Sequence, residues 1–136
     1  MNNTKKYKLL VVEDEDALRQ LYVDVLQEAG YEVVQAKDGE VALKLIKENQ
    51  YDLILLDIIL PHLDGLQLLE KLQKDHGIKD IGRSVVLLTN LGQELVVAKA
   101  LEYNVRGYMV KSDYTPDELI KEIHGYLSNH KVHSSL

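Results

Sequence analysis

Polar residues with metal-binding or phosphorus chemistry come directly after short apolar runs of this chain. Glu13 and Asp14 follow the run 9–12, Asp57 follows 53–56, Thr89 follows 85–88, and Lys111 follows 108–110. Uninterrupted apolar runs of this length are typical of strands buried on both faces of a parallel sheet. Ligands of such sheets bind just outside the carboxyl ends of the strands. The spacing therefore predicts carboxylates, a hydroxyl and an ammonium gathered at one edge.

Strand-like and helical patterns alternate along the whole chain, which indicates repeated strand–helix–strand units and a parallel sheet. The strands are expected at 9–12, 32–36, 53–57, 85–89 and 107–111. Right-handed crossovers with helices on both faces give an α/β fold with a doubly wound five-stranded sheet, flavodoxin-like (βα)5, in the order 2-1-3-4-5. This order places the first and third strands side by side, with Glu13, Asp14 and Asp57 at the mouth.

Recognisable start and stop signals bound the five expected helices. Gly30 is expected to end the first helix, Asp38 to open the second, and the third to end near Gly77. Asn104 is a left-handed stop for the fourth. Before the fifth, Thr115-Pro116-Asp117-Glu118 predicts a capping box, in which Thr115 and Glu118 bond each other's backbone N–H.

Size and composition limit the function classes. With 136 residues and no cysteine, the chain is expected to form one domain over 1–129 with a tail at 130–136, and to have neither disulfides nor thiolate metal sites. The formal net charge of -6 argues against direct nucleic-acid binding. No apolar stretch approaches the ~20 residues of a membrane span, and no signal peptide is visible. A cytoplasmic location is expected.

The motifs at the strand ends together resemble the receiver domain of bacterial two-component response regulators. The matching stretches are 10–15 (LVVEDE), 55–57 (LLD) followed by Pro61 and Asp64-Gly65, 87–89 (LLT) and 107–111 (GYMVK). Each motif is weak by itself, but their order and separations are specific. The resemblance covers nearly the whole folded length and implies a single-domain regulator or an excised receiver.

The resemblance implies that Asp57 is the phosphoacceptor. Glu13, Asp14, Asp57 and the backbone carbonyl of Ile59 would hold Mg²⁺, or Mn²⁺ in its place. Electrostatics also favours a cation at this site, because two carboxylates ~4 Å apart repel by about 4 kcal/mol at an effective dielectric of 20. A hard dication with oxygen ligands offsets that repulsion. Such a domain would assist its own phosphotransfer and dephosphorylation and would not be an enzyme.

The resemblance also implies a conformational switch. Thr89 and Lys111 would contact the phosphoryl group, and Tyr108 would be the aromatic rotamer switch. The donor would be a phosphohistidine on a sensor histidine kinase or a histidine phosphotransfer protein. The output would be a downstream protein target bound through the fourth helix, fifth strand and fifth helix. Apolar exposure of Val96 and Val97 there is expected to support a homodimer.

Several positions depart from the family pattern. Ser112 follows Lys111 where the family usually has proline. The Lys111–Ser112 peptide is therefore either trans, with a reshaped loop, or cis and strained. The choice affects the direction in which the Lys111 ammonium points. Asn90 replaces a small residue beside Thr89. Ile59 and Leu91 flank the site, and we hypothesise that they impede the attacking water and prolong the phosphorylated state.

Simpler interpretations remain open for the same residues. Asp57 could cap a loop, Thr89 could be an ordinary strand residue, Lys111 a surface charge and Tyr108 a packing residue, while Glu15 and Asp16 fit a solvated helix start. At the level of function, a receiver-like adaptor that is never phosphorylated is one alternative. A small hydrolase with an aspartate nucleophile is another, although Ile59 stands where its second aspartate is expected. A flavin module lacks its phosphate loop here.

Overall fold

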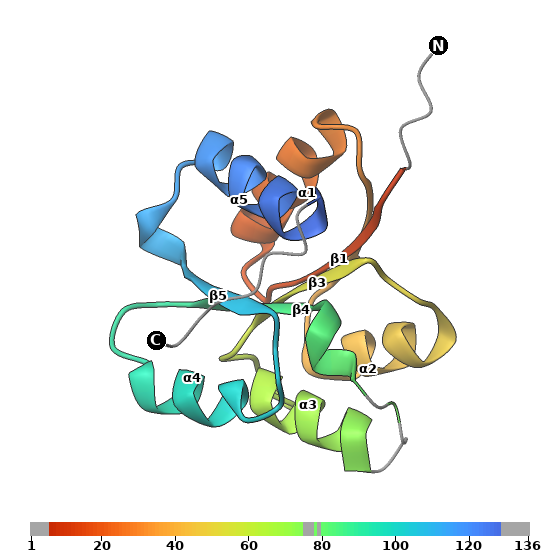
Figure 1. The fold of residues 1–136 in the computed structure, drawn as a ribbon, viewed down its shortest axis with the longest axis vertical. Coiled ribbons are helices and arrows are strands. Elements are labelled where there is room, and N and C mark those ends of the chain that lie inside the picture. The colour runs from red at the N-terminus through yellow and green to blue at the C-terminus, as the bar shows by residue number, and fades with distance from the viewer. Residues whose placement is uncertain (1–5, 75–77, 79, 129–136) are drawn as a thin grey trace.

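Five parallel strands form one sheet in the order β2-β1-β3-β4-β5, as predicted (Figure 1). The computed structural model describes residues 6–74, 78 and 80–128. The strands are β1 (Lys8–Val12), β2 (Glu32–Ala36), β3 (Leu53–Asp57), β4 (Val85–Thr89) and β5 (Gly107–Val110). β5 ends one residue earlier than predicted because Lys111 begins a short 3₁₀ helix, Lys111–Asp113.

Helices cover both faces of the sheet, which confirms the doubly wound α/β fold. They are α1 (Asp16–Glu28), α2 (Gly39–Glu48), α3 (Gly65–Lys74), α4 (Glu94–Leu101) and α5 (Pro116–Ser128). Figure 1 shows α1 and α5 on one face and α2, α3 and α4 on the other. A second short 3₁₀ helix, Ile81–Ser84, precedes β4 and was not predicted.

Alternate residues of the central strands enter two separate cores. Leu10 and Val12 pack with the residues of α2, α3 and α4, whereas Leu9 and Val11 pack with those of α1 and α5. All four are fully buried. Full burial of such a side chain stabilises the fold by about 1.5–3 kcal/mol, so both faces of β1 must be apolar. This double burial explains the uninterrupted apolar run and fixes where β1 ends.

The predicted helix boundaries are largely confirmed. Gly30 and Asn104 have φ of 103° and 58°, the left-handed conformation expected at helix ends. The Asp38 carboxylate accepts from the Val41 N–H at 2.9 Å. The Thr115 N–H donates to Glu118 Oε1 at 2.8 Å, and the Glu118 N–H donates to Thr115 Oγ1 at 3.2 Å.

Two expectations fall on parts of the chain that the structure does not describe. They are the end of the third helix near Gly77 and the tail at 130–136. Among the described helices, none combines the length and the apolar character that crossing a membrane requires.

Candidate phosphoacceptor and metal site

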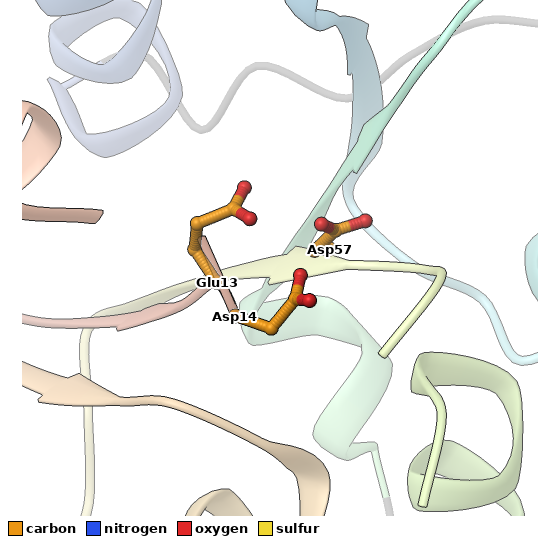
Figure 2. Close-up of side chains that lie close together, drawn as sticks. All are labelled: Glu13, Asp14 and Asp57. Atoms are coloured by element: carbon orange, nitrogen blue, oxygen red, sulfur yellow. The ribbon is translucent and has the colours of Figure 1, made fainter. Parts of the chain in front are cut away.

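The register of the sheet brings the three acids together. Val12 of β1 pairs with Leu56 of β3, so the residues that follow them, Glu13 and Asp57, lie at the same level at this edge of the sheet. Ligand oxygens of Glu13, Asp14 and Asp57 all lie within 4.8 Å of one another. Figure 2 shows the Glu13 and Asp14 side chains at the end of β1 and Asp57 at the end of β3. The proximity expected from the strand ends is therefore present.

The Lys111 ammonium bridges two of these acids. Its Nζ donates to Glu13 Oε1 at 2.6 Å and to Asp57 Oδ2 at 2.8 Å. Both acceptors are deeply buried, with Glu13 1% and Asp57 3% exposed. The Lys111–Ser112 peptide is trans. With this trans peptide the lysine is aimed into the acid cluster, and a short 3₁₀ helix, Lys111–Asp113, follows β5.

Backbone groups orient both buried carboxylates. The Ile59 N–H donates to Asp57 Oδ1 at 3.1 Å, while the other Asp57 oxygen bonds Lys111. The Glu15 N–H donates to Glu13 Oε2 at 3.1 Å. With each oxygen of Asp57 and of Glu13 engaged, the two side chains are held in fixed orientations before any ligand arrives.

Burial and charge shift the titration of this cluster. Burial raises the pKa of the Asp57 carboxyl to about 6, and the negative charge of Glu13 adds to this, while Lys111 acts in the opposite direction. Burial alone would lower the pKa of Lys111, but its bonds to Asp57 and Glu13 outweigh burial, and the pKa is raised. The lysine is therefore charged and stabilises Asp57 as a carboxylate.

The donor set fits a hard dication. Three carboxylates and one ammonium leave two formal negative charges in the cluster. Mg²⁺ prefers oxygen ligands and commonly uses only one or two carboxylates while keeping several waters. Asp14 is exposed and Glu13 and Asp57 are buried, so the cluster has one solvent-facing side where an ion and its waters can enter. The Ile59 carbonyl as a fourth ligand stays a prediction.

Thr89 lies at the end of β4, and its hydroxyl is already in use. Thr89 is buried, and its Oγ1 donates to Gln93 Oε1 at 2.7 Å, with the Asn90 carbonyl at 3.1 Å. Thr89 and Tyr108 line the same groove of about 470 Å³ beside α4. Tyr108 is half-buried and packs against the core on that face.

Sequence reasoning missed two residues of this region. Arg19 donates to the Glu13 carbonyl at 2.9 Å and to Asp16 Oδ1 at 2.7 Å, and so fixes the acidic loop. Its position three residues after Asp16, an ion-pair spacing on a helix, was the available signal. Gln93 was also missed, because no pattern marks a glutamine four residues after a strand-end threonine.

One exposure prediction was wrong. Val97 is only 7% exposed, because it faces the core under α4, and Val96 is intermediate. The exposed apolar residues near this helix are instead Leu95, 83% exposed, and Leu91. Exposed apolar side chains therefore lie in the first turn of α4 and in the loop before it, not at Val97.

Comparison with known proteins identifies the same domain family that the sequence motifs resemble. The family model for the response regulator receiver domain matches residues 9–124. The phosphate regulon transcriptional regulatory protein PhoB of Escherichia coli is 36% identical over 116 residues, which are 85% of this chain and 49% of PhoB. The probable transcriptional regulator ycf27 of Guillardia theta is 35% identical over 122 residues, which are 90% of this chain and 46% of that protein.

Solved structures agree with this assignment. The receiver domain of the Francisella response regulator 1452 superposes with a TM-score of 0.75 at 30% identity, covering 93% of this chain and all of that one. The chemotaxis response regulator CheY4 of Vibrio cholerae gives a TM-score of 0.76 at 26% identity, covering 88% of this chain and 98% of CheY4. The chain spans about half the length of the curated relatives it matches.

Proposed function

The chain belongs to the response regulator receiver domain family, and on that premise we propose that it is a phosphoacceptor switch. Asp57 takes a phosphoryl group from a phosphohistidine on a sensor histidine kinase or a phosphotransfer protein. The observation that carries this proposal is the buried Asp57 carboxylate beside Glu13, Asp14 and the Lys111 ammonium. The transfer breaks the phosphorus–nitrogen bond of the donor and forms a phosphorus–oxygen bond to Asp57.

The fixed groups around Asp57 support a nucleophilic role. The Ile59 N–H and Lys111 hold the two carboxylate oxygens, which orients the nucleophile. When the phosphoryl group arrives, the Lys111 ammonium is within reach of its charge and offsets the repulsion from Glu13. Glu13, Asp14, Asp57 and the Ile59 carbonyl would hold Mg²⁺ or Mn²⁺, which supplies further stabilisation of phosphoryl charge.

We further propose that the state of Asp57 is transmitted through Thr89 and Tyr108. When the Thr89 hydroxyl donates to the phosphoryl group, the surroundings of Thr89 change. The Tyr108 ring then turns within the groove that both residues line. The output surface is formed by α4, β5 and α5 and binds a downstream protein. A homodimer through this face and a cytoplasmic location stay predictions, and the buried Val97 removes part of the basis for the dimer.

Intact-mass measurement with a small phosphodonor tests the proposal. Incubation with phosphoramidate and Mg²⁺ is expected to add one phosphoryl group to the wild type and none to Asp57→Asn. Asp24→Asn on α1, a charge removal at an exposed residue, is the matched control and is expected to react like the wild type. A wild type that gains no mass supports the unphosphorylated adaptor instead. Continuous release of phosphate without a persistent covalent species would support the hydrolase.

A further inference from the structure

We propose that Gln93 is a positioning residue that competes with the phosphoryl group for the single hydroxyl proton of Thr89. This inference rests on the proposed function and deepens it. It would make Gln93 the group that holds the resting state and sets how strongly phosphorylation switches the domain. The observation behind it is the short hydrogen bond of 2.7 Å from Thr89 Oγ1 to Gln93 Oε1.

The Gln93 side chain is committed to the end of β4. Its Oε1 accepts a second hydrogen bond from the Asn90 N–H at 2.9 Å, so both acceptor positions of the amide oxygen are filled. Although Gln93 stands at the N-cap position of α4, its side chain caps no backbone N–H of that helix. The residue instead reaches back across the loop, while its own carbonyl accepts from the Val97 N–H at 3.0 Å in the first turn of α4. Gln93 therefore ties the end of β4 to the start of α4.

The competition follows from the chemistry of a hydroxyl group. A threonine hydroxyl carries one proton and cannot donate strongly to two acceptors at once. Donation to an anionic phosphoryl oxygen is charge-assisted and about twice as strong as donation to a neutral amide. Donation to the phosphoryl group is therefore favoured, but only by the difference in free energy between the two hydrogen bonds. Breaking the hydrogen bond to Gln93 costs free energy during activation. Once it is broken, Thr89 is no longer tied to the start of α4.

Release of Gln93 gives the signal a route to the surface beside that through Tyr108. The loop from Thr89 to Gln93 carries Leu91, and α4 carries Leu95 one position after its first residue, both strongly exposed. When the Thr89 hydroxyl donates to the phosphoryl group instead, the Gln93 amide oxygen keeps only its hydrogen bond from the Asn90 N–H. The partly exposed Gln93 side chain can then rearrange. The apolar surface at the start of α4 then responds directly to Asp57.

Substitution of Gln93 tests this inference through the affinity for a phosphoryl mimic. Beryllofluoride, a tetrahedral anion, is titrated into the Mg²⁺-loaded protein and followed by NMR. Gln93→Leu removes the acceptor at similar size and is expected to tighten binding by about 2- to 10-fold, the equivalent of one neutral hydrogen bond. Gln93→Glu provides a stronger, anionic acceptor and is expected to weaken binding. Gln20→Leu on α1 is the matched control and should bind like the wild type.

A second background isolates the hydroxyl. In Thr89→Val, which lacks the hydroxyl at similar shape, Gln93→Leu is expected to leave the affinity unchanged. An equal effect of Gln93→Leu in both backgrounds would overturn the inference, because the glutamine would then act by a different route. Denaturant unfolding of every variant verifies folding.

The outcomes separate this inference from the proposed function. If the wild type gains a phosphoryl group and binds beryllofluoride, but Gln93→Leu binds it with unchanged affinity, only the role of Gln93 is wrong. If the wild type takes neither group, the proposed function fails and the inference fails with it.

Discussion

Replacing Lys111 by methionine is expected to destabilise the metal-free protein and to make its stability depend more strongly on Mg²⁺. The ammonium lies 2.6 Å from Glu13 and 2.8 Å from Asp57, and both carboxylates are buried. Without Lys111, two buried negative charges face each other with Asp14 nearby. Methionine keeps most of the side-chain volume, so the effect reports on the charge.

The magnitude follows from the distances. At an effective dielectric constant of about 20, each of the two ion pairs attracts by about 6 kcal/mol. Desolvation cancels much of this, and loss of one partner from a buried pair costs about 3–5 kcal/mol. Burial raises the pKa of the Asp57 carboxyl to about 6 even while Lys111 lowers it, so partial protonation in the variant relieves part of the repulsion. We therefore expect a loss of about 2–4 kcal/mol at neutral pH, or roughly 10 °C in Tm for a domain of this size.

Thermal unfolding in chelator and in excess Mg²⁺ is the assay. The variant is expected to gain more from Mg²⁺ than the wild type, because the ion replaces a missing positive charge, so the difference in Tm narrows. Lys74→Met is the control, since Lys74 pairs with Glu70 at 3.3 Å on the surface, with the lysine side chain 68% exposed. A Lys111→Met variant that unfolds at the wild-type temperature in chelator, as Lys74→Met is expected to do, would show that the two ion pairs do not stabilise the site.

Three further predictions concern other residues. Gly65→Ala is expected to cost about 1–3 kcal/mol of unfolding free energy. The added Cβ would lie 2.8 Å from the backbone oxygen of Asp57 and 2.9 Å from Ile58 Cα. Denaturant unfolding measures this loss, and an unchanged midpoint would contradict it. Thr115→Ala removes the cap acceptor of α5 and should cost about 1 kcal/mol by the same measurement, whereas a neutral effect would mean the capping box contributes nothing. Ile59→Asn is expected to shorten the lifetime of the phosphorylated protein in a time course of intact mass, and equal lifetimes would refute a water-excluding role for Ile59.

The fold and the proximity of the acids could be predicted because one physical constraint determines both. A strand covered on both faces must be apolar until it leaves the sheet, so the first polar residue marks its carboxyl end. In β3, every residue through Leu56 is buried and apolar, and Asp57 follows. The parallel register then places Glu13 level with Asp57 without any further information. The same rule located Thr89 and Lys111.

Features set by tertiary packing escaped sequence reasoning. The fourth helix was predicted, but the side that faces the core depends on how the helix lies on the sheet, and Val97 proved buried while Leu95 is exposed. The partner of the Thr89 hydroxyl also depends on the path of a loop, and it is Gln93. For the step from Lys111 to Ser112, both peptide geometries were open from the sequence, and only the structure shows the trans form.

Calorimetric titration with Mg²⁺ tests most directly the central claim, that folding assembles a site for one dication from Glu13, Asp14 and Asp57. The wild type is expected to bind one ion, and Asp14→Asn is expected to bind it at least about 10-fold more weakly, a loss of about 1.4 kcal/mol. Glu15→Gln, which removes the exposed neighbouring charge outside the cluster, should differ little from the wild type. A wild type without measurable Mg²⁺ binding, or an Asp14→Asn variant with wild-type affinity, would contradict the account.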